Sequence, residues 1–212
     1  MIKAVLFDMD GVLIEAKDWH YEALNRALAL FGLAIDRDAH LATFDGLPTR
    51  RKLEMLSRTR NLPVALHSFI NEIKQEETVQ ITYASCKPVF HHRYALAELK
   101  KDGLRLGVCS NSIRQTIDLM MRLSGLSDFL DLTISNEDVA RSKPDPEMYN
   151  NAISQMGLSP TEVLILEDND HGIAAARASG AHVLVIGTTN DVTYQNIRSS
   201  IDRINEDQIN AG

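Results

Sequence analysis

The sequence of 212 residues contains only two cysteines, Cys86 and Cys109, and their spacing fits neither a zinc site nor a redox pair. So few cysteines in a chain of this size are typical of a reduced protein, and we expect it to be cytoplasmic. The N-terminal apolar run breaks at Asp8, too soon for a signal peptide or a membrane span. We therefore expect no membrane partner.

Basic residues are outnumbered, since 22 Lys and Arg against 29 Asp and Glu give a formal net charge of −7. A protein that binds duplex nucleic acid needs a basic face, so we expect no nucleic-acid partner. An anionic substrate would need a local group of positive charges or a metal ion to receive it. We expect a monomer or a weak oligomer.

Short apolar runs alternate with helical patterns along most of the chain. Such runs predict buried parallel strands, because helices cover both faces of a parallel sheet. We therefore predict an α/β fold with a doubly wound parallel sheet and helices on both faces. The predicted strands are residues 2–7, 104–109, 132–134, 163–166 and 182–186.

Residues 18–83 show helical patterns without strands. Apolar residues at helical spacing occupy 19–31 and stop at Gly32, and further helices are predicted to begin near Pro48 and after Pro63. Because this block follows the first strand, it predicts a small all-helical domain inserted into the sheet domain. The predicted boundaries are 1–14 with 87–212 for the core and 15–86 for the insert.

Polar residues follow three of the predicted strands, at the ends where parallel sheets bind their ligands. The first strand ends in Asp8-Met9-Asp10, the second in Ser110-Asn111-Ser112, and the fourth in Glu167-Asp168-Asn169-Asp170. Lys143 precedes a helix that is predicted to begin near Pro146. Carboxylates at close range repel each other unless a cation lies among them, and oxygen ligands of this kind suit Mg²⁺. The strand ends therefore predict a hard-cation site beside a phosphate site.

Each segment also has an ordinary structural interpretation. Residues 8–11 are a common loop string, residues 110–112 are typical of a helix N-cap, and residues 143–146 fit an exposed helix start. Glu167 and Asp168 fit a cap of the following helix. These interpretations are independent of one another, so they do not explain why all the segments fall at strand or loop ends.

The segments DMDGVL (8–13), SNS (110–112), KPDP (143–146) and EDND (167–170) resemble the four sequence motifs of the haloacid dehalogenase-like hydrolase superfamily. Their spacing and the helical insert resemble its β-phosphoglucomutase and small-phosphatase branch. The resemblance extends over residues 2–187. It implies a Rossmann-like core with a helical cap domain inserted after the first strand.

The resemblance also implies a role for each motif residue. Asp8 would be the nucleophile that forms an aspartyl phosphate, which suits a carboxylate because it is ionised at neutral pH and needs no base. Asp10 would be the general acid and then the general base. Ser110 would bind a phosphoryl oxygen, and Lys143 would offset charge. The implied Mg²⁺ ligands are Asp8, the Asp10 backbone carbonyl, Glu167 and Asp168, while Asp170 supports the helix entry and Asn111 binds substrate.

Substrate selectivity is expected from the helical insert. The resemblance implies substrate contacts at His20, Gly46, Arg50 and Lys74. Alternatives exist for three of them: Arg50 begins a basic run, 50–52, that is typical of a solvated helix face. Lys74 has acidic neighbours with which it would form an ordinary ion pair, and His20 has aromatic neighbours against which it would pack.

The expected activity is Mg²⁺-dependent hydrolysis of a small phosphorylated metabolite, such as a sugar, polyol or amino-alcohol phosphate. A β-phosphoglucomutase-like sugar phosphomutase is the alternative, because no single residue separates the two activities. Ala16 at the hinge, where mutases tend to carry a hydroxyl residue, and the string 110–114 favour the phosphatase. A non-catalytic binding module is disfavoured because Asp8, Asp10, Ser110, Lys143 and Asp168 are all present.

Overall fold

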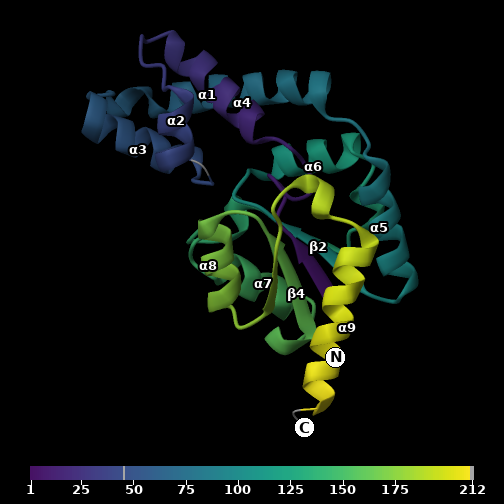
Figure 1. The fold of residues 1–212 in the computed structure, drawn as a ribbon. Coiled ribbons are helices and arrows are strands. Elements are labelled where there is room, and N and C mark those ends of the chain that lie inside the picture. The colour runs from purple at the N-terminus through teal and green to yellow at the C-terminus, as the bar shows by residue number, and fades with distance from the viewer. Residues whose placement is uncertain (45, 211–212) are drawn as a thin grey trace. The chain divides into compact units, whose positions relative to one another are not determined.

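The structure is a computed structural model that describes residues 1–44 and 46–210, and it divides into two compact units (Figure 1). The core unit comprises Met1–Glu15 and Lys87–Gly212, and the helical unit comprises Ala16–Cys86. Within the described ranges, no helix is long and apolar enough to span a membrane.

The core unit is built around a parallel sheet whose strand order is β3-β2-β1-β4-β5 in the part of the chain that the structure describes. The central strand β1 pairs with β2 on one side and with β4 on the other, so Ala4 lies opposite both Arg105 and Val163. Each strand predicted from an apolar run is present, which confirms the predicted α/β fold. The strands are β1 (Ala4–Phe7), β2 (Arg105–Cys109), β3 (Leu132–Ile134), β4 (Val163–Glu167) and β5 (His182–Val185).

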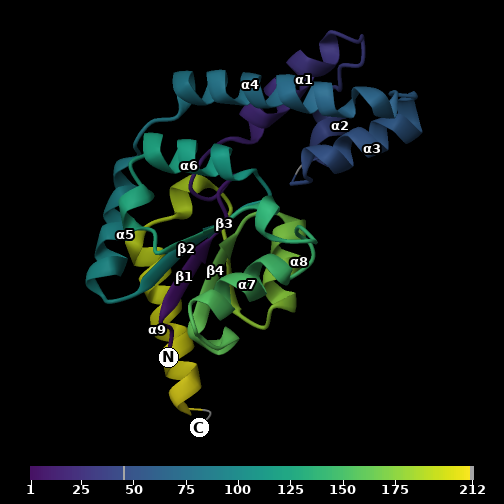
Figure 2. The same ribbon diagram turned by 180° about the vertical axis from the view of Figure 1, so that it is seen from behind.

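Helices cover both faces of this sheet. The helices α5 (Phe90–Lys101) and α9 (Tyr194–Asn210) lie against each other on one face, and α7 (Glu147–Gln155) and α8 (Asp170–Ala178) lie on the other (Figures 1 and 2). The helix α6 (Arg114–Leu123) connects β2 to β3. Because side chains alternate along a strand, Ala4 and Leu6 of β1 face the core formed with α7 and α8, and Val5 points to the opposite face of the sheet.

The helical unit contains α1 (Lys17–Ala29), α3 (Thr49–Arg60) and α4 (His67–Ser85), all of which the sequence predicts. Gly32, at φ 67°, closes the first helix as expected, because glycine adopts left-handed backbone angles without strain. Buried apolar residues of the three helices and the loops between them form one core: Leu24, Ala27, Leu28, Ile35, Phe44, Leu53, Leu56, Leu62 and Ile70.

The sequence does not predict α2 (Arg37–Ala39) or the π-helical turn His40–Phe44 that follows it. Both are too short to show a helical repeat of apolar residues. Five 3₁₀ turns within the described residues also went unpredicted for this reason: Val64–Leu66, Ser127–Phe129, Asn136–Asp138, Pro160–Glu162 and Thr189–Asp191.

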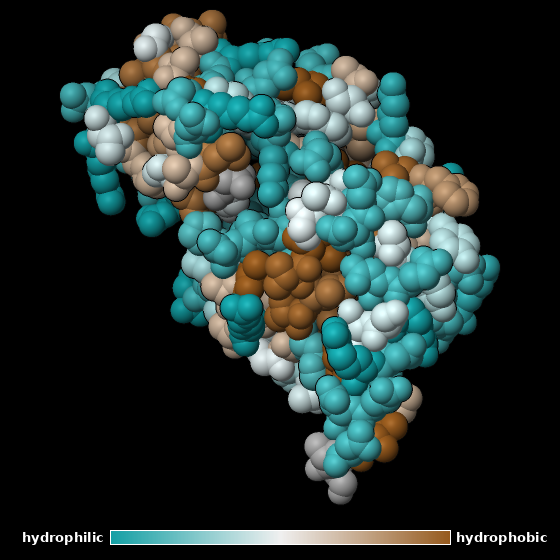
Figure 3. All heavy atoms as spheres, in the orientation of Figure 1, coloured by the Kyte–Doolittle hydropathy of each residue, from teal (hydrophilic) through white to brown (hydrophobic). Residues whose placement is uncertain are grey.

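Hydrophobic side chains gather on one exposed face of the core unit, between α8 and α9 (Figure 3). The edge strand β5 lies there, and Val185 is 52 % exposed. The central strands β1 and β4 are buried along their whole length. The polar site described below is therefore built on the buried strands and not on the edge.

Glu162 joins the beginning of β1 to the turn before β4. Its carboxylate lies 2.6 Å from Lys3 Nζ and accepts hydrogen bonds from the Ser159 N–H and hydroxyl at 2.9 and 3.0 Å. The Lys3 ammonium, followed by these Ser159 donors, lowers the pKa of Glu162 from 4.5 to about 2. Glu162 is therefore more strongly acidic in the folded chain than in the unfolded chain.

We expect Glu162→Gln to destabilise the fold at neutral pH and to have progressively less effect as the pH falls. A lowered folded-state pKa stabilises the fold fully above the unfolded pKa of 4.5, and this stabilisation disappears as the pH falls through about 2. Urea unfolding of both proteins between pH 7 and pH 3 measures the difference. Glu98→Gln, which breaks an exposed pair with Lys101, is the matched control. A Glu162→Gln effect that is the same at both pH values contradicts the expectation.

Candidate active site

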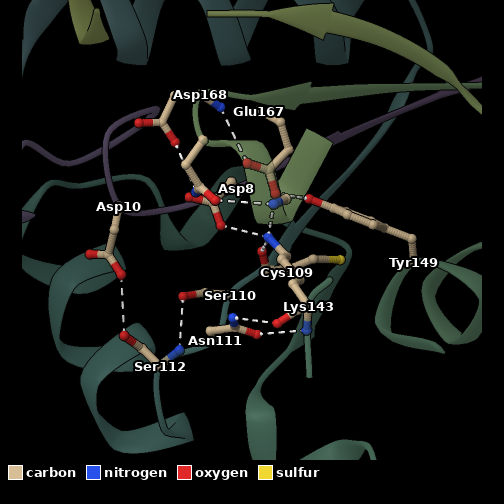
Figure 4. A network of polar contacts seen from close by, with 12 residues as sticks. Asp8, Asp10, Cys109, Ser110, Asn111, Ser112, Lys143, Tyr149, Glu167 and Asp168 are labelled. Carbon is tan, nitrogen blue, oxygen red and sulfur yellow. Dashed lines mark hydrogen bonds and ion pairs between the residues drawn. The ribbon is translucent and has the colours of Figure 1, made fainter. Parts of the chain in front are cut away.

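Polar residues from the carboxyl ends of β1, β2 and β4 lie together in the core unit (Figure 4). Because β2 and β4 flank β1, the sheet brings Asp8, Ser110 and Glu167 to the same edge. The Asp8 N–H donates to the Leu166 carbonyl at 3.0 Å, which continues the pairing of β1 with β4 up to the site. All three side chains are buried.

Lys143 lies at the centre of this cluster, although it comes from the loop before α7. Its Nζ donates to Asp8 Oδ1 at 2.6 Å, to Glu167 Oε1 at 2.7 Å and to the Cys109 carbonyl at 2.8 Å. The Lys143 side chain is 2 % exposed and the Glu167 side chain 0 %. Buried charges are tolerated when they are paired and hydrogen-bonded, as they are here.

Burial and neighbouring charges together set the pKa values of the cluster. Burial raises the pKa of Asp8 well above its ordinary value, Lys143 opposes that shift, and the neighbouring carboxylates of Glu167, Asp10 and Asp168 add to it. Burial alone lowers the pKa of Lys143, but Asp8 and Glu167 outweigh burial, so that this pKa is raised. The lysine therefore stays charged, and acidic side chains outnumber it at the site.

The acidic residues fit a divalent cation. Carboxylate oxygens of Asp8, Glu167 and Asp168 all lie within 4.8 Å of one another. Oxygen-only donors of this kind suit Mg²⁺, and a cation there would offset the surplus of negative charge. The donor set and the charge of the site thus agree with the cation that the sequence predicts.

Tyr149 completes the surroundings of Glu167, and the sequence did not indicate it. Its hydroxyl donates to Glu167 Oε1 at 2.5 Å, and Lys143 Nζ lies 4.8 Å from the centre of its ring. On the other side, a Cβ on Gly172 would lie 2.0 Å from the Glu167 carboxylate, so only glycine leaves room for it there. The available signal was a tyrosine on the buried face of α7, since a buried hydroxyl needs a partner.

The segment after β2 contributes to the site through each of its side chains. The Ser110 hydroxyl accepts from the Ser112 N–H at 3.1 Å, and the Ser112 hydroxyl donates to Asp10 Oδ2 at 3.2 Å. The Asn111 amide faces the main chain of Lys143 (Figure 4). The structure thus brings Asp10, Ser110 and Asn111 to the same edge of the sheet as Asp8.

Two ordinary interpretations of the motifs are wrong. The N-cap residue of α6 is Ile113, which makes no side-chain cap, so Ser110–Ser112 is not the helix cap. Asn169 caps α8 by accepting from the Gly172 N–H at 3.0 Å, so Glu167 and Asp168 do not have that role. Asp170 is the first residue of α8, as expected of a helix-entry residue.

The candidate substrate contacts in the helical unit fall into two groups. Lys74 on α4 is buried, and its Nζ lies 3.3 Å from His20 Nδ1 on α1. The Arg50 side chain is 89 % exposed and pairs with Glu54 at 3.1 Å. Gly46 precedes α3 with a φ of 70°. The structure thus brings His20 and Lys74 together and leaves Arg50 on an exposed helix surface.

A model of the family described as haloacid dehalogenase-like hydrolase matches residues 5–186, a range that contains every residue of the cluster. The chain belongs to the haloacid dehalogenase-like hydrolase family. The hydrolase is 28 % identical over 193 residues to a phosphorylated carbohydrates phosphatase from Thermotoga maritima, with 90 % of this chain and 88 % of the relative covered.

Two further similarities concern other named activities. The hydrolase is 26 % identical over 189 residues to the pyrophosphatase PpaX of Bacillus velezensis, covering 89 % of this chain and 84 % of the relative. The solved structure of β-phosphoglucomutase from Clostridium difficile matches with a TM-score of 0.85, covering 99 % of this chain and 100 % of that one. At 21 % identity, the second similarity shows the fold alone.

We expect Tyr149→Phe to destabilise the hydrolase by about 1.5–3 kcal/mol, because it removes a buried hydrogen bond to the Glu167 carboxylate. Tyr194→Phe is the matched control. It removes a hydroxyl that donates to Asp102 at 3.0 Å on the exposed surface, where about 0.5 kcal/mol or less is expected. Chemical denaturation at neutral pH measures both, and equal losses would contradict a special role for the buried hydroxyl.

Proposed function

We propose that this hydrolase is a Mg²⁺-dependent phosphatase that acts on a small phosphorylated metabolite through an aspartyl phosphate on Asp8. The observation that carries the proposal is the buried Asp8 carboxylate at the end of the central strand, held by Lys143 at 2.6 Å. With a cation beside it to favour its ionised form, a carboxylate held in this way would need no base to activate it for attack on phosphorus. Membership of the hydrolase family and the two phosphatase relatives support the same reaction class.

The proposed reaction has two steps. In the first, an Asp8 oxygen bonds to phosphorus, the bond from phosphorus to the leaving oxygen breaks, and Asp10 gives that oxygen a proton. In the second, Asp10 takes a proton from water, whose oxygen bonds to phosphorus while the bond to Asp8 breaks. Inorganic phosphate leaves, and both aspartates return to their starting states. Ser110 holds a phosphoryl oxygen, and Lys143 offsets the charge on Asp8 and the phosphoryl group.

Asp8, Glu167, Asp168 and the Asp10 backbone carbonyl are the proposed ligands of Mg²⁺. The close approach of the three carboxylates supports this assignment. When bound, the cation supplies electrostatic screening of the phosphoryl oxygens, so that an anionic nucleophile can approach phosphorus.

We propose that the core unit performs the chemistry and that the helical unit, residues 15–86, is a cap that selects the substrate. The candidate contacts within that unit are the buried Lys74–His20 pair and the exposed Arg50 guanidinium. Gly46, which lies just before α3, is a further candidate. Positive groups of this kind suit an anionic or polyhydroxylated metabolite. The carbohydrate phosphatase of T. maritima favours a sugar or polyol phosphate as the substrate class.

A phosphomutase is the second candidate, because the chain shares its fold with β-phosphoglucomutase. A mutase must protect its aspartyl phosphate from water while the sugar intermediate reorients, whereas a phosphatase must admit water. Ala16, at the junction of the two units, has no hydroxyl with which to contribute to such protection. This feature favours hydrolysis.

We expect Asp8→Asn to lower kcat by roughly a thousandfold or more while the fold is retained, because the amide has the same shape but cannot attack phosphorus. Asp118→Asn, on the exposed side of α6, is the control for the same chemical change and should keep full activity. Circular dichroism verifies folding. Beryllium fluoride with Mg²⁺ should form an acyl-phosphate mimic on Asp8 of the wild type only. Substantial turnover by purified Asp8→Asn would rule out the covalent mechanism.

The phosphatase is separated from the mutase by following two products at once. We expect phosphate release from at least one member of a panel of phosphorylated sugars, polyols, amino alcohols and pyrophosphate, only when Mg²⁺ is present. Glucose 1-phosphate of either anomer is incubated with and without glucose 1,6-bisphosphate while phosphate and glucose 6-phosphate are measured. Bisphosphate-dependent formation of glucose 6-phosphate with little free phosphate would identify a mutase instead.

A further inference from the structure

The side chain of Asn111 is turned toward the main chain of Lys143, a residue 32 positions further along the chain. Its Oδ1 accepts from the Lys143 N–H at 3.1 Å, and its Nδ2 donates to the Lys143 carbonyl at 3.4 Å (Figure 4). One planar amide thus engages both the donor and the acceptor of a single residue, as a neighbouring strand would.

The main chain of Asn111 is itself held in place. Asn111 directly follows Ser110, whose N–H donates to the Ile134 carbonyl at 3.0 Å. The Asn111 carbonyl accepts from Asn136 Nδ2 at 2.8 Å. The Asn111 main chain is therefore held on one side by backbone pairing of Ser110 with the end of β3, and on the other by the side chain of Asn136.

Lys143 needs such support because its side chain is long. A lysine stem has four rotatable carbons, so hydrogen bonds at its tip alone do not fix where the main chain lies. The tip is bound to Asp8, Glu167 and the Cys109 carbonyl, and the other end is bound to Asn111. Fixing both ends sets the distance that the ammonium can reach and so keeps it in contact with Asp8.

We propose that Asn111 is a positioning residue that acts through Lys143 and does not itself bind the substrate. This inference rests on the proposed function, in which Lys143 stabilises charge on Asp8 and on the transferring group. Its two neighbours have a different orientation: the Ser110 hydroxyl faces the site, and the Ser112 hydroxyl donates to the Asp10 carboxylate.

A positioning role predicts a loss of kcat without a matching rise in KM. We expect Asn111→Ala to lower kcat roughly tenfold to a hundredfold, the effect of misplacing a catalytic group by about 1 Å. The loss should be equal for a metabolite substrate and for p-nitrophenyl phosphate, because Lys143 acts on the phosphoryl group that both share. Asn196→Ala is the matched control: it removes an amide that donates to the Asp191 carbonyl at 2.9 Å, and kcat should be unchanged.

A double-mutant cycle with Lys143→Ala tests whether Asn111 acts through the lysine. We expect Asn111→Ala to have almost no further effect on kcat in the Lys143→Ala background, since the group that it positions is gone. The affinity of the same four proteins for inorganic phosphate is also measured, by titration calorimetry in the presence of Mg²⁺. This measurement does not depend on turnover. If Asn111→Ala does not fold in a thermal unfolding assay, Asn111→Ser takes its place in the cycle.

The outcomes separate this inference from the proposed function. A wild type without phosphatase activity overturns the proposed function. If the wild type is active and the fold losses in kcat caused by Asn111→Ala and Lys143→Ala simply multiply in the double mutant, the positioning role is overturned. A rise in KM that appears only with the metabolite also overturns it, because that result identifies Asn111 as a substrate contact. Equal losses with both substrates, together with a cycle in which the effects are not additive, support the inference.

Discussion

The Lys143 ammonium, buried between the Asp8 and Glu167 carboxylates, is the interaction on which the candidate site depends. Removing an ion from water costs several kcal/mol even after relaxation, so a buried lysine persists only where its partners are held at close range. Each partner here is fixed by the fold: Asp8 by the end of β1, Glu167 by the end of β4, and the Cys109 carbonyl by the end of β2. Breaking this arrangement would leave buried charge of one sign without compensation.

The strand order explains why these groups meet. Only an interior strand has neighbours on both sides, and β1 is flanked by β2 and β4 although both come much later in the chain. Their carboxyl ends therefore converge around Asp8. Two helices also contact Glu167: α7 supplies the Tyr149 hydroxyl, and Gly172 of α8 leaves room for the carboxylate. The candidate site is thus a consequence of topology combined with two close helix contacts.

Much of this could be predicted from the sequence, because apolar runs and strand-end residues are local signals. The strand at residues 132–134 was predicted with its observed bounds, and Asp8, Ser110 and Glu167 follow from the rule that parallel sheets bind ligands at carboxyl ends. The remaining features depend on contacts between distant segments. The bond from Tyr149 to Glu167 depends on how α7 is rotated against the sheet, which no local pattern specifies.

In the helical unit, too, contacts between distant segments could not be predicted from the sequence. Three glutamates lie within three positions of Lys74 in the sequence, yet Nζ of this lysine lies beside His20, which is 54 residues away on another helix. Sequence spacing describes neighbours along one helix but not neighbours across two packed helices. For the same reason, the sequence suggested that Arg50, Arg51 and Lys52 share a solvated face, whereas Lys52 is buried.

The charged cluster is assembled wholly within the core unit, from residues that precede Glu15 or follow Lys87. The bonds that join Lys143 to Asp8, Cys109 and Glu167 all lie within the core unit, so substitutions in the helices of the other unit leave these partners of Lys143 in place. This separation gives a physical reason why relatives of similar coverage carry names as different as a carbohydrate phosphatase and a pyrophosphatase. A phosphoryl group is the same in every substrate, whereas the rest of the molecule differs. The proposed division assigns the constant part of the substrate to the rigid sheet edge and the variable part to an insert that is free to diverge.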